Sequence, residues 1–202
     1  MNIFRLRDLV SVLAYRLAAM FFGAFGRRVR VVWPMRLVGV RHMHFADDVT
    51  IANGGYLAAL PEIGTTPKLT VGRGSRIGEL SHIICAHSVT IGEDVLIANR
   101  VFISDCSHRF ADPSVAVLHQ GLEALGPVMI GDGSWVGENA CIFGATIGKQ
   151  CVVGANSVVM ADVPDHCMVV GSPGRIVKRY CPQRQSWCRT DASGAFAEAG
   201  DV

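Results

Sequence analysis

Ile147-Gly-Lys-Gln-Cys-Val-Val153-Gly-Ala-Asn-Ser-Val-Val159 is the stretch that decides the fold. An aliphatic residue stands at every sixth position, and a glycine follows the first two of them. Six residues suffice for one short strand and one tight turn, and glycine, which lacks a Cβ, turns at low cost. Three such hexads make one coil of about 18 residues whose aliphatic side chains point toward a common axis.

The same spacing occurs in four triples along the chain. Their aliphatic positions are Val71, Ile77 and Ile83; Ile91, Ile97 and Ile103; Ile130, Val136 and Ile142; and Ile147, Val153 and Val159. The second triple lies 20 residues after the first, and the fourth lies 17 residues after the third. Twelve positions that obey one rule argue against an ordinary sheet with coincidental Ile-Gly pairs. Because a stack can bury an interior that one coil cannot, the pattern predicts a parallel β-helix with equivalent side chains roughly 4.7–4.9 Å apart.

The repeat is interrupted once. Ile103 and Ile130 are 27 residues apart where the rule requires six, so about 21 residues must leave one corner of the coil. We expect an extruded loop at 104–127, and loops of this length in compact domains usually carry function. Asp105 and His108 stand three residues apart where the loop begins. The place at which the repeat stops makes His108 the first candidate for catalysis.

Composition narrows the class of protein. The chain has 202 residues, half of them apolar, which is enough for one domain with a buried core. The net charge is +2 and no run of Lys and Arg is present, so the sequence does not indicate a basic surface that would bind nucleic acid. Seven scattered cysteines without a CxxC pair argue against a secreted disulfide framework and favour reduced thiols in the cytoplasm.

The N-terminal segment, residues 1–28, departs from the repeat. Apolar residues at helical spacing predict a helix there, and they are Leu6, Leu9, Val10, Leu13, Leu17 and Met20. The apolar run is too short for a membrane span, is broken by Arg16, and lacks the cleavage site of a signal peptide. Two interpretations remain: the helix packs on the body of the protein, or residues 1–26 contact a membrane surface with nearby arginines at the lipid headgroups.

The predicted fold is therefore mostly β, a single-stranded parallel β-helix with an N-terminal α-helix and an extruded loop. The β-helix domain is expected at 29–171, with irregular opening coils up to about residue 71. Pro164 and Pro173 end the regular pattern, and a C-terminal extension follows at 172–202. From Cys181 onward the apolar periodicity is weak, so we expect a frayed tail.

About residues 69 to 180 resemble the hexapeptide-repeat acyltransferases, in particular sugar O-acetyltransferases of the maltose/galactoside type and of bacterial surface-polysaccharide synthesis. The resemblance is carried by 91–108, 127–137, 144–148, 153–159 and Val170-Gly-Ser-Pro-Gly-Arg175. It implies a left-handed β-helix, a hand that spacing alone does not show. It also implies a homotrimer with acetyl-CoA bound in the groove between neighbouring prisms.

Within this resemblance, His108 matches the family's general base. Acetyl transfer from a thioester to a hydroxyl requires the hydroxyl to lose its proton as it attacks, and an imidazole, with an ordinary pKa of about 6.5, suits that task. Asp105 and Glu123 are both candidates to orient the ring or the acceptor, and the sequence does not choose between them. Cys106 is an alternative thiol nucleophile, although nothing obvious in the sequence activates it.

Six residues occupy positions at which relatives contact CoA: Trp135, Glu138, Ala155, Met160, Arg175 and Lys178. Small residues would let the backbone approach the pantetheine arm, and the two basic residues would meet its phosphates. Two departures weaken the match: Glu138 is acidic where relatives are usually small or neutral, and Met160-Ala161 replaces a commoner Thr-Lys. A second interpretation of Trp135 is an aromatic packed at the edge of a coil.

The resulting hypothesis is an acetyl-CoA-dependent O-acetyltransferase that acts on a sugar hydroxyl in surface-polysaccharide synthesis, in the cytoplasm or at the inner face of the membrane, without a metal. One alternative is a metal enzyme, because gamma-class carbonic anhydrases resemble this fold. His82 and His87 have their H-x4-H spacing, but a third histidine is not evident. The other alternative is a non-catalytic β-helix scaffold. The acceptor, its reacting group and the acyl chain length cannot be read from the sequence.

Overall fold

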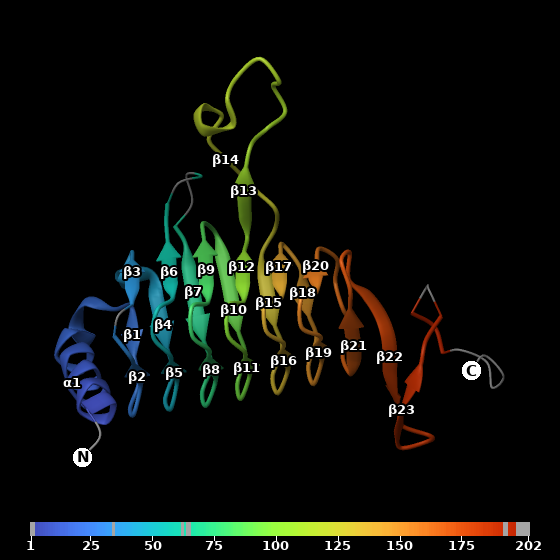
Figure 1. Cartoon of the computed structure of the whole chain (residues 1–202), viewed down its shortest axis with the longest axis horizontal. Coiled ribbons are helices and arrows are strands. Elements are labelled where there is room, and N and C mark those ends of the chain that lie inside the picture. Colours follow the sequence, from blue (N-terminus) through green and yellow to red (C-terminus); the bar gives the residue numbers. More distant parts are fainter. Residues whose placement is uncertain (1–2, 34, 62, 64–65, 192–193, 197–202) are drawn as a thin grey trace.

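The computed structural model is a prism of stacked coils, with a helix at one end and a hairpin standing out from one corner (Figure 1). It describes residues 3–33, 35–61, 63, 66–191 and 194–196. Residues 1–2, 192–193 and 197–202, which belong to the two predicted terminal segments, lie outside the described residues.

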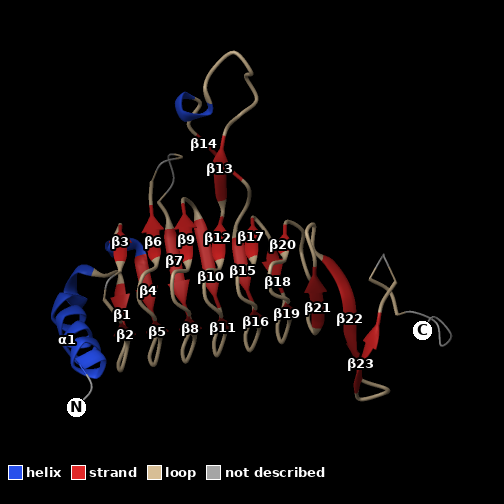
Figure 2. Ribbon diagram, viewed as in Figure 1, coloured by secondary structure: helices blue, strands red, loops and turns tan. Residues whose placement is uncertain are grey.

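Three sheets form the faces of the prism, and the strands that run along each coil pair in parallel (Figure 2). The first face contains β1 (Ala24–Phe25), β4 (Met43–Phe45), β7 (Lys68–Val71), β10 (Ser88–Ile91), β15 (Val128–Ile130) and β18 (Thr146–Ile147). The second contains β2 (Arg30–Val31), β5 (Thr50–Ile51), β8 (Arg76–Ile77), β11 (Leu96–Ile97), β16 (Trp135–Val136), β19 (Val152–Val153), β21 (Cys167–Val170), β22 (Arg175–Cys181) and β23 (Ser186–Arg189). The third contains β3 (Arg36–Val38), β6 (Tyr56–Ala59), β9 (His82–Cys85), β12 (Phe102–Ser104), β17 (Cys141–Phe143) and β20 (Val158–Val159).

The interior of the prism consists of aliphatic ladders, one for each face. On the first face Val71, Ile91, Ile130 and Ile147 pair in register, and each is at most 1% exposed. The predicted inward positions on the other two faces also belong to the core. The hexad prediction is therefore confirmed, and burial of these side chains is the main stabilising term of the scaffold.

The corners bring the backbones of neighbouring coils close together. A Cβ on Gly72 would lie 2.4 Å from the carbonyl oxygen of Gly92, so this position requires glycine. At the same corner, buried Ser75 donates from Oγ to the carbonyl of Gly92 at 2.7 Å and accepts from the amide of Val95 at 2.9 Å. Small residues and a bridging hydroxyl thus hold successive turns together.

The opening coils are regular, contrary to the sequence prediction. Strands β1 to β6 make two full coils, and Phe45 of the second pairs with Phe25 on one side and Val71 on the other. Phe45 is 1% exposed, and the rings of Phe22 and Phe25 lie 5.6 Å and 6.2 Å from its ring. Aromatic side chains therefore fill the interior at this end where aliphatic ones do so elsewhere.

The N-terminal helix α1 (Ile3–Leu17) is shorter than the predicted segment 1–28. A 3-10 turn, η1 (Ala18–Phe21), follows it, β1 already begins at Ala24, and a second 3-10 turn, η2 (Val40–His42), precedes β4. The helix lies at the first end of the prism, where its nearest strand is β2 (Figure 1). No helix in the described ranges is long and apolar enough to cross a bilayer.

The other end of the prism is extended by an antiparallel ribbon. Strand β22 pairs antiparallel with β21, and β23 pairs antiparallel with β22. The rings of Tyr180 and Trp187, which are partners across this last pair, lie 6.1 Å apart. The predicted frayed tail is therefore wrong for Ser186–Arg189, which form a strand.

Candidate active site

The interruption of the repeat is a β-hairpin that leaves the third corner of the prism, where the third face returns to the first (Figure 1). Its stem is formed by β13 (Cys106–His108) and β14 (Leu122–Ala124), and a 3-10 turn, η3 (Val117–His119), lies between them. The sequence predicted an extruded loop at 104–127. The structure adds a paired stem, which gives His108 a defined place above the corner.

Asp105 anchors the base of this hairpin. Its side chain is completely buried and accepts three backbone hydrogen bonds, from the amides of Ala86 at 2.7 Å, His87 at 2.8 Å and Ser88 at 2.6 Å. Its own carbonyl accepts from the amide of Leu125 at 2.9 Å. Charge-assisted bonds of this kind are short and strong. Both carboxylate oxygens are thus directed at the turn that joins β9 to β10, and not at the stem that carries His108.

Cys106 is buried beside Ser104. The Ser104 hydroxyl donates to the Cys106 carbonyl at 2.7 Å and lies 3.6 Å from its sulfur. Only 6% of Cys106 is exposed, so the thiol has little access to a substrate. These contacts give Cys106 a packing role and speak against the alternative of a thiol nucleophile.

His108 ends the first strand of the stem and is exposed to solvent. In the part of the chain that the structure describes, its ring has no hydrogen bond or ion pair. His108 pairs across the stem with Leu122, whereas Glu123 pairs with Ser107. Because cross-strand partners share one face of a hairpin and successive residues alternate, Glu123 faces away from the side of His108. The structure therefore brings neither predicted orienting residue to the ring.

A groove opens beside the base of the stem. Its volume is about 330 Å³, and its lining residues are Ser107, Leu125, Phe143, Gly144 and Met160. Met160, one of the predicted donor residues, is 61% exposed there. Gly144 has φ of +51°, and a Cβ on it would lie 2.5 Å from the carbonyl oxygen of Leu125. A glycine at this position thus lets the base of the hairpin pack against the next coil and shapes the groove.

Three other predicted donor residues lie elsewhere on the chain. Trp135 is 49% exposed on β16 of the second face. Glu138 and Ala155 belong to turns at the second corner, which joins the second face to the third. Glu138 pairs with Arg100 of the preceding coil, with 2.7 Å between Oε1 and Nη1. The acidic side chain at this position, which is unusual among the relatives, thus has a basic partner in the same chain.

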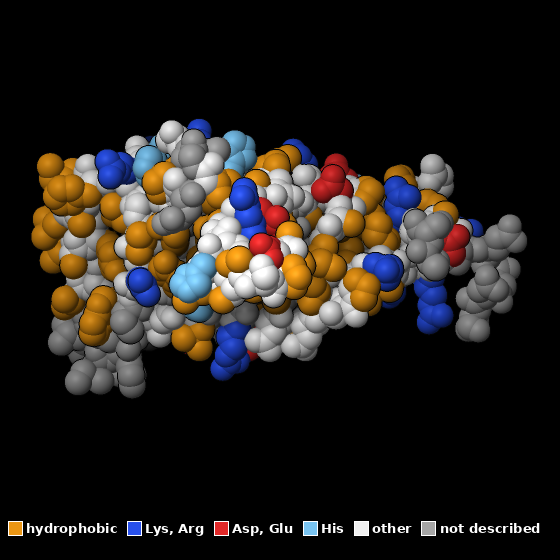
Figure 3. Space-filling view, turned by 90° about the horizontal axis from the view of Figure 1, so that it is seen from above, with side chains coloured by type: hydrophobic (Ala, Val, Ile, Leu, Met, Phe, Trp, Pro, Cys, Tyr) orange, Lys and Arg blue, Asp and Glu red, His pale blue; other side chains and the backbone are white. Residues whose placement is uncertain are grey.

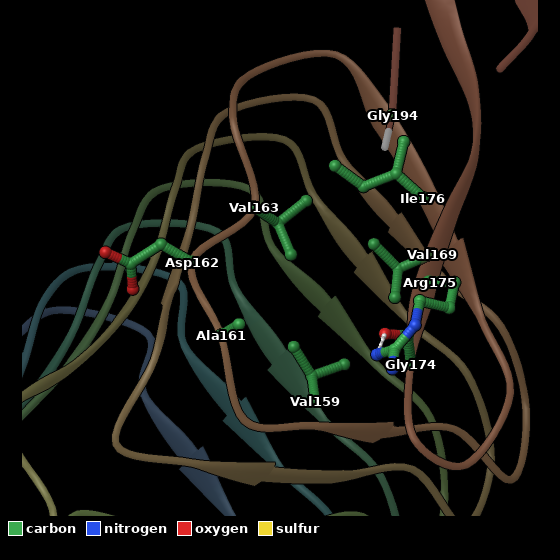
Figure 4. Close-up of a pocket in the computed structure, with 9 residues that line it drawn as sticks. All are labelled: Val159, Ala161, Asp162, Val163, Val169, Gly174, Arg175, Ile176 and Gly194. Atoms are coloured by element: carbon green, nitrogen blue, oxygen red, sulfur yellow. Dashed lines mark hydrogen bonds between the residues drawn. The ribbon is translucent and has the colours of Figure 1, made fainter. Parts of the chain in front are cut away.

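The last two predicted donor residues lie on the C-terminal ribbon. Arg175 and Lys178 are on β22, opposite Val170 and Met168 of β21. Arg175 also borders a cavity of about 180 Å³ near the end of the aliphatic ladder. Figure 4 shows the guanidinium group beside Gly174, whose carbonyl accepts a hydrogen bond from Arg175 Nη1 at 3.0 Å. Among the described residues, no hydrogen bond or ion pair joins either cation to His108.

The metal alternative finds no support in the described residues. Among them, no group of three or more His, Cys, Asp and Glu side chains is close enough to hold a metal ion. His82 is exposed on β9 and packs edge-on against Tyr56, with 6.0 Å between ring centroids. His87 is exposed in the turn after β9.

Sequence reasoning missed two features of the site. Leu125 and Phe143 line the groove, and the ring of Phe143 lies 5.3 Å from that of Phe102. Phe143 follows the inward residue of its hexad directly, so its position relative to the repeat was a usable signal. Arg100, the partner of Glu138, stands one coil earlier at the equivalent turn, and the same register would have indicated it.

The sequence and the fold are similar to those of known proteins. Residues 127–161 match the family model described as the hexapeptide repeat of succinyl-transferase. The chain is 37% identical over 120 residues to an Escherichia coli protein provisionally named lipopolysaccharide biosynthesis O-acetyl transferase WbbJ, covering 55% of this chain and 61% of that protein. It is 30% identical over 169 residues to a probable acetyltransferase of Mycobacterium tuberculosis, covering 72% of this chain and 54% of the relative. The chain thus spans between about half and three-fifths of the length of these relatives.

Two solved structures share the prism. AntD, an N-acyltransferase from Bacillus cereus in complex with dTDP and 3-hydroxybutyryl-CoA, superposes with a TM-score of 0.71 at 19% identity, covering 85% of this chain and 90% of AntD. The hexapeptide-repeat acetyltransferase VCA0836 of Vibrio cholerae, complexed with acetyl coenzyme A, superposes with a TM-score of 0.58 at 26% identity. The match covers 82% of this chain and 75% of VCA0836. The chain thus carries the hexapeptide repeat of these acyltransferases at residues 127–161, and its fold is their left-handed parallel β-helix.

Proposed function

We propose that this chain transfers an acetyl group from acetyl-CoA to a sugar hydroxyl, with His108 as the general base. The observation that carries the proposal is an exposed imidazole held at the end of a paired stem, one residue after Ser107, which lines a groove of about 330 Å³. Because successive residues of the stem alternate, the ring lies on the other face of the stem from Ser107. The relatives add support, because the E. coli protein is named as an O-acetyl transferase and the V. cholerae structure contains acetyl coenzyme A.

The proposed chemistry is a direct transfer. The acceptor hydroxyl gives its proton to an unprotonated nitrogen of His108 while its oxygen attacks the thioester carbonyl carbon. The C–S bond then breaks, and the sulfur of CoA leaves and takes up the proton from the imidazolium. A positioned base of this kind typically contributes about 10²–10⁴ in rate. The absence of an orienting carboxylate beside His108 in the described chain leaves that role to the substrate or to a neighbouring subunit.

A site shared between chains is the second part of the proposal. His108 and Met160 lie at the third corner, whereas Trp135 lies on the second face and Ala155 at the second corner. These positions would meet if the third corner of one prism faced the second face of another, as in a homotrimer. The donor would then lie between the two chains, with Arg175 and Lys178 available for its phosphates.

Mixing experiments test that arrangement. His108→Ala and Trp135→Ala chains, each weakly active alone, should regain activity when co-expressed, because some interfaces then combine an intact histidine with an intact tryptophan. Mixed assemblies no more active than either parent would contradict the shared site.

The acceptor is proposed to be a saccharide of a surface polysaccharide, modified on oxygen and in the cytoplasm. The E. coli relative, through its name, favours oxygen and lipopolysaccharide, whereas AntD is an N-acyltransferase, but at 19% identity AntD bears on the fold alone. No disulfide joins any of the seven cysteines, all of which lie in the described part of the chain, and this fits a reducing compartment.

A screen of acetyl-CoA consumption tests the acceptor class. Purified protein is incubated with acetyl-CoA and either neutral saccharides and nucleotide sugars or their amino-sugar counterparts. The proposal predicts turnover with hydroxyl acceptors and retention of that turnover after treatment with a metal chelator. Turnover confined to amino sugars would replace O-transfer by N-transfer, and turnover lost on chelation would favour the metal alternative.

A further inference from the structure

Helix α1 turns its more polar side toward the protein. Ser11 is only 5% exposed, and Tyr15 packs against the hydrophobic core. On the opposite side, Leu9, Leu13 and Leu17, spaced four residues apart, are 64%, 61% and 75% exposed. A helix on the surface of a globular protein usually does the reverse and buries its apolar stripe. The outward direction of the leucines is therefore not explained by packing on the prism.

The exposed apolar surface continues beyond the helix. Met20 and Phe21 of η1 are 80% and 64% exposed, and Val10 is 59% exposed. We call this set, Leu9, Val10, Leu13, Leu17, Met20 and Phe21, the apolar face of α1. Figure 3 shows hydrophobic side chains gathered at the end of the molecule where α1 lies, with basic side chains among them. Contiguous apolar surface of this kind marks a docking site more often than a neutral surface.

The excess of positive charge is concentrated at the same end of the chain. Residues 1–48 contain eight arginines against three acidic residues, whereas residues 49–202 contain eleven basic against fourteen acidic residues. Arg27 and Arg28 pair with Asp47 and Asp48 of the next coil, so part of this charge is balanced. Arg16 and Arg41 are exposed, with one bond from Arg16 Nη1 to the carbonyl of Gly26. The first end of the prism is thus both apolar and basic, while the rest of the chain carries a negative balance.

We infer that the apolar face of α1 docks the protein on an anionic lipid bilayer. Leu, Met and Phe side chains would enter the boundary between headgroups and acyl chains, and the arginines would meet lipid phosphates. A helix of 15 residues does not span a bilayer, so it would lie in the plane of the surface. A second copy of the chain is a poorer occupant, because self-association through this face would bring two arginine-rich ends together. The inference does not depend on the transferase activity.

Vesicle sedimentation of the full chain tests this surface. The protein should sediment with vesicles of phosphatidylglycerol and phosphatidylcholine in equal parts, and much less with vesicles of phosphatidylcholine alone. A Leu13→Asp/Leu17→Asp variant, changed only at exposed positions, should partition at least about tenfold less into the anionic vesicles. The control is Leu118→Asp, because Leu118 is 81% exposed in η3 and should leave binding unchanged.

Three outcomes would overturn the inference. They are wild-type protein that stays in solution with anionic vesicles, equal sedimentation with both kinds of vesicle, and a double variant that binds as the wild type does. A double variant that changes the size of the assembly in light scattering while vesicle binding stays the same would identify the face as a contact between copies. Thermal unfolding of each variant checks that the substitutions leave the fold intact.

Discussion

The interior of the prism and its third corner are built from opposite kinds of residue. In the interior, similar aliphatic side chains recur at equivalent places, as with Ile91 and Ile130, and each is buried against a neighbour of the same type. At the third corner each residue occurs once: Asp105 holds a turn, Ser107 lines the groove and His108 ends a strand. The interior therefore specifies the fold through repetition, whereas the corner specifies a site through single residues. Interior positions should tolerate exchange among aliphatics and reject charge, while corner positions should be sensitive to the loss of one functional group.

A charge in the interior should have the largest effect on folding. Ile130→Asp would bury an unpaired carboxylate at a position that is 0% exposed, and we expect a loss of more than about 5 kcal/mol, which prevents folding. Met129, the preceding residue of the same strand, is 47% exposed, so Met129→Asp serves as the matched control with a loss below about 1 kcal/mol. Soluble yield and urea unfolding measure both. A folded Ile130→Asp protein would contradict the claim that the buried aliphatic ladder stabilises the fold.

The next largest effect is expected at Asp105. Asp105→Ala would leave the amides of Ala86, His87 and Ser88 without their acceptor in a buried place, at a cost of about 3–5 kcal/mol. Asp112, an exposed carboxylate near the tip of the hairpin that accepts from Ser114, is the control, and Asp112→Ala should cost less than about 1 kcal/mol. Chemical denaturation measures the free energy of unfolding of both variants. Wild-type stability with reduced turnover in Asp105→Ala would instead assign Asp105 a role in orienting the base.

Alkaline pH should weaken the core through its buried thiols. Burial, with the charge of Asp105 as a second cause, raises the pKa of Cys85 to about 12, and burial raises the pKa of Cys151 to about 11. The folded chain thus keeps both protons where the unfolded chain, with an ordinary thiol pKa near about 8.5, loses them. The free energy of unfolding should therefore fall as pH rises above about 9, by up to about 1.4 kcal/mol per pH unit for each thiol. Cys85→Ala should flatten this decline, and an unchanged slope would contradict the assignment.

The smallest effect is expected for the surface pair at the second corner. Arg100 and Glu138 are 57% and 45% exposed, so a double-mutant cycle with alanine should give a coupling of about 0.2–1 kcal/mol that salt reduces. The Michaelis constant for acetyl-CoA of Glu138→Ala provides a second measurement. A clear change in that constant together with zero coupling would make Glu138 a donor-binding residue and not a partner of Arg100.

Much of the fold could be predicted because the physical rule repeats. The offset of 20 residues that relates Val71 to Ile91 also relates Val31 to Ile51, so even the opening coils carried the signal. It was hidden because Phe25 and Phe45 stand where the later coils have aliphatics, and because extra residues separate β6 from β7. The C-terminal ribbon could not be predicted, since the burial along β22 does not alternate clearly and its partners are set by the tertiary structure.

The candidate site could be predicted only in part. The broken spacing located the hairpin and indicated His108, but the role of Asp105 depends on three amides that stand 17 to 19 residues earlier in sequence. The face on which Glu123 lies depends on the register of the stem, which pairs it with Ser107. The grouping of the donor residues on separate corners follows from the way the coils stack, and no spacing in the sequence reports it.

The most direct test of the account compares turnover of His108→Ala with that of His119→Ala. Both histidines are exposed in the same hairpin, but only His108 belongs to its paired stem. With acetyl-CoA and an acceptor established for the wild type, His108→Ala should lose about 10²–10⁴ in kcat while keeping its thermal stability, and His119→Ala should retain wild-type turnover. Equal turnover of the two variants would contradict the claim that the scaffold positions His108 as the base.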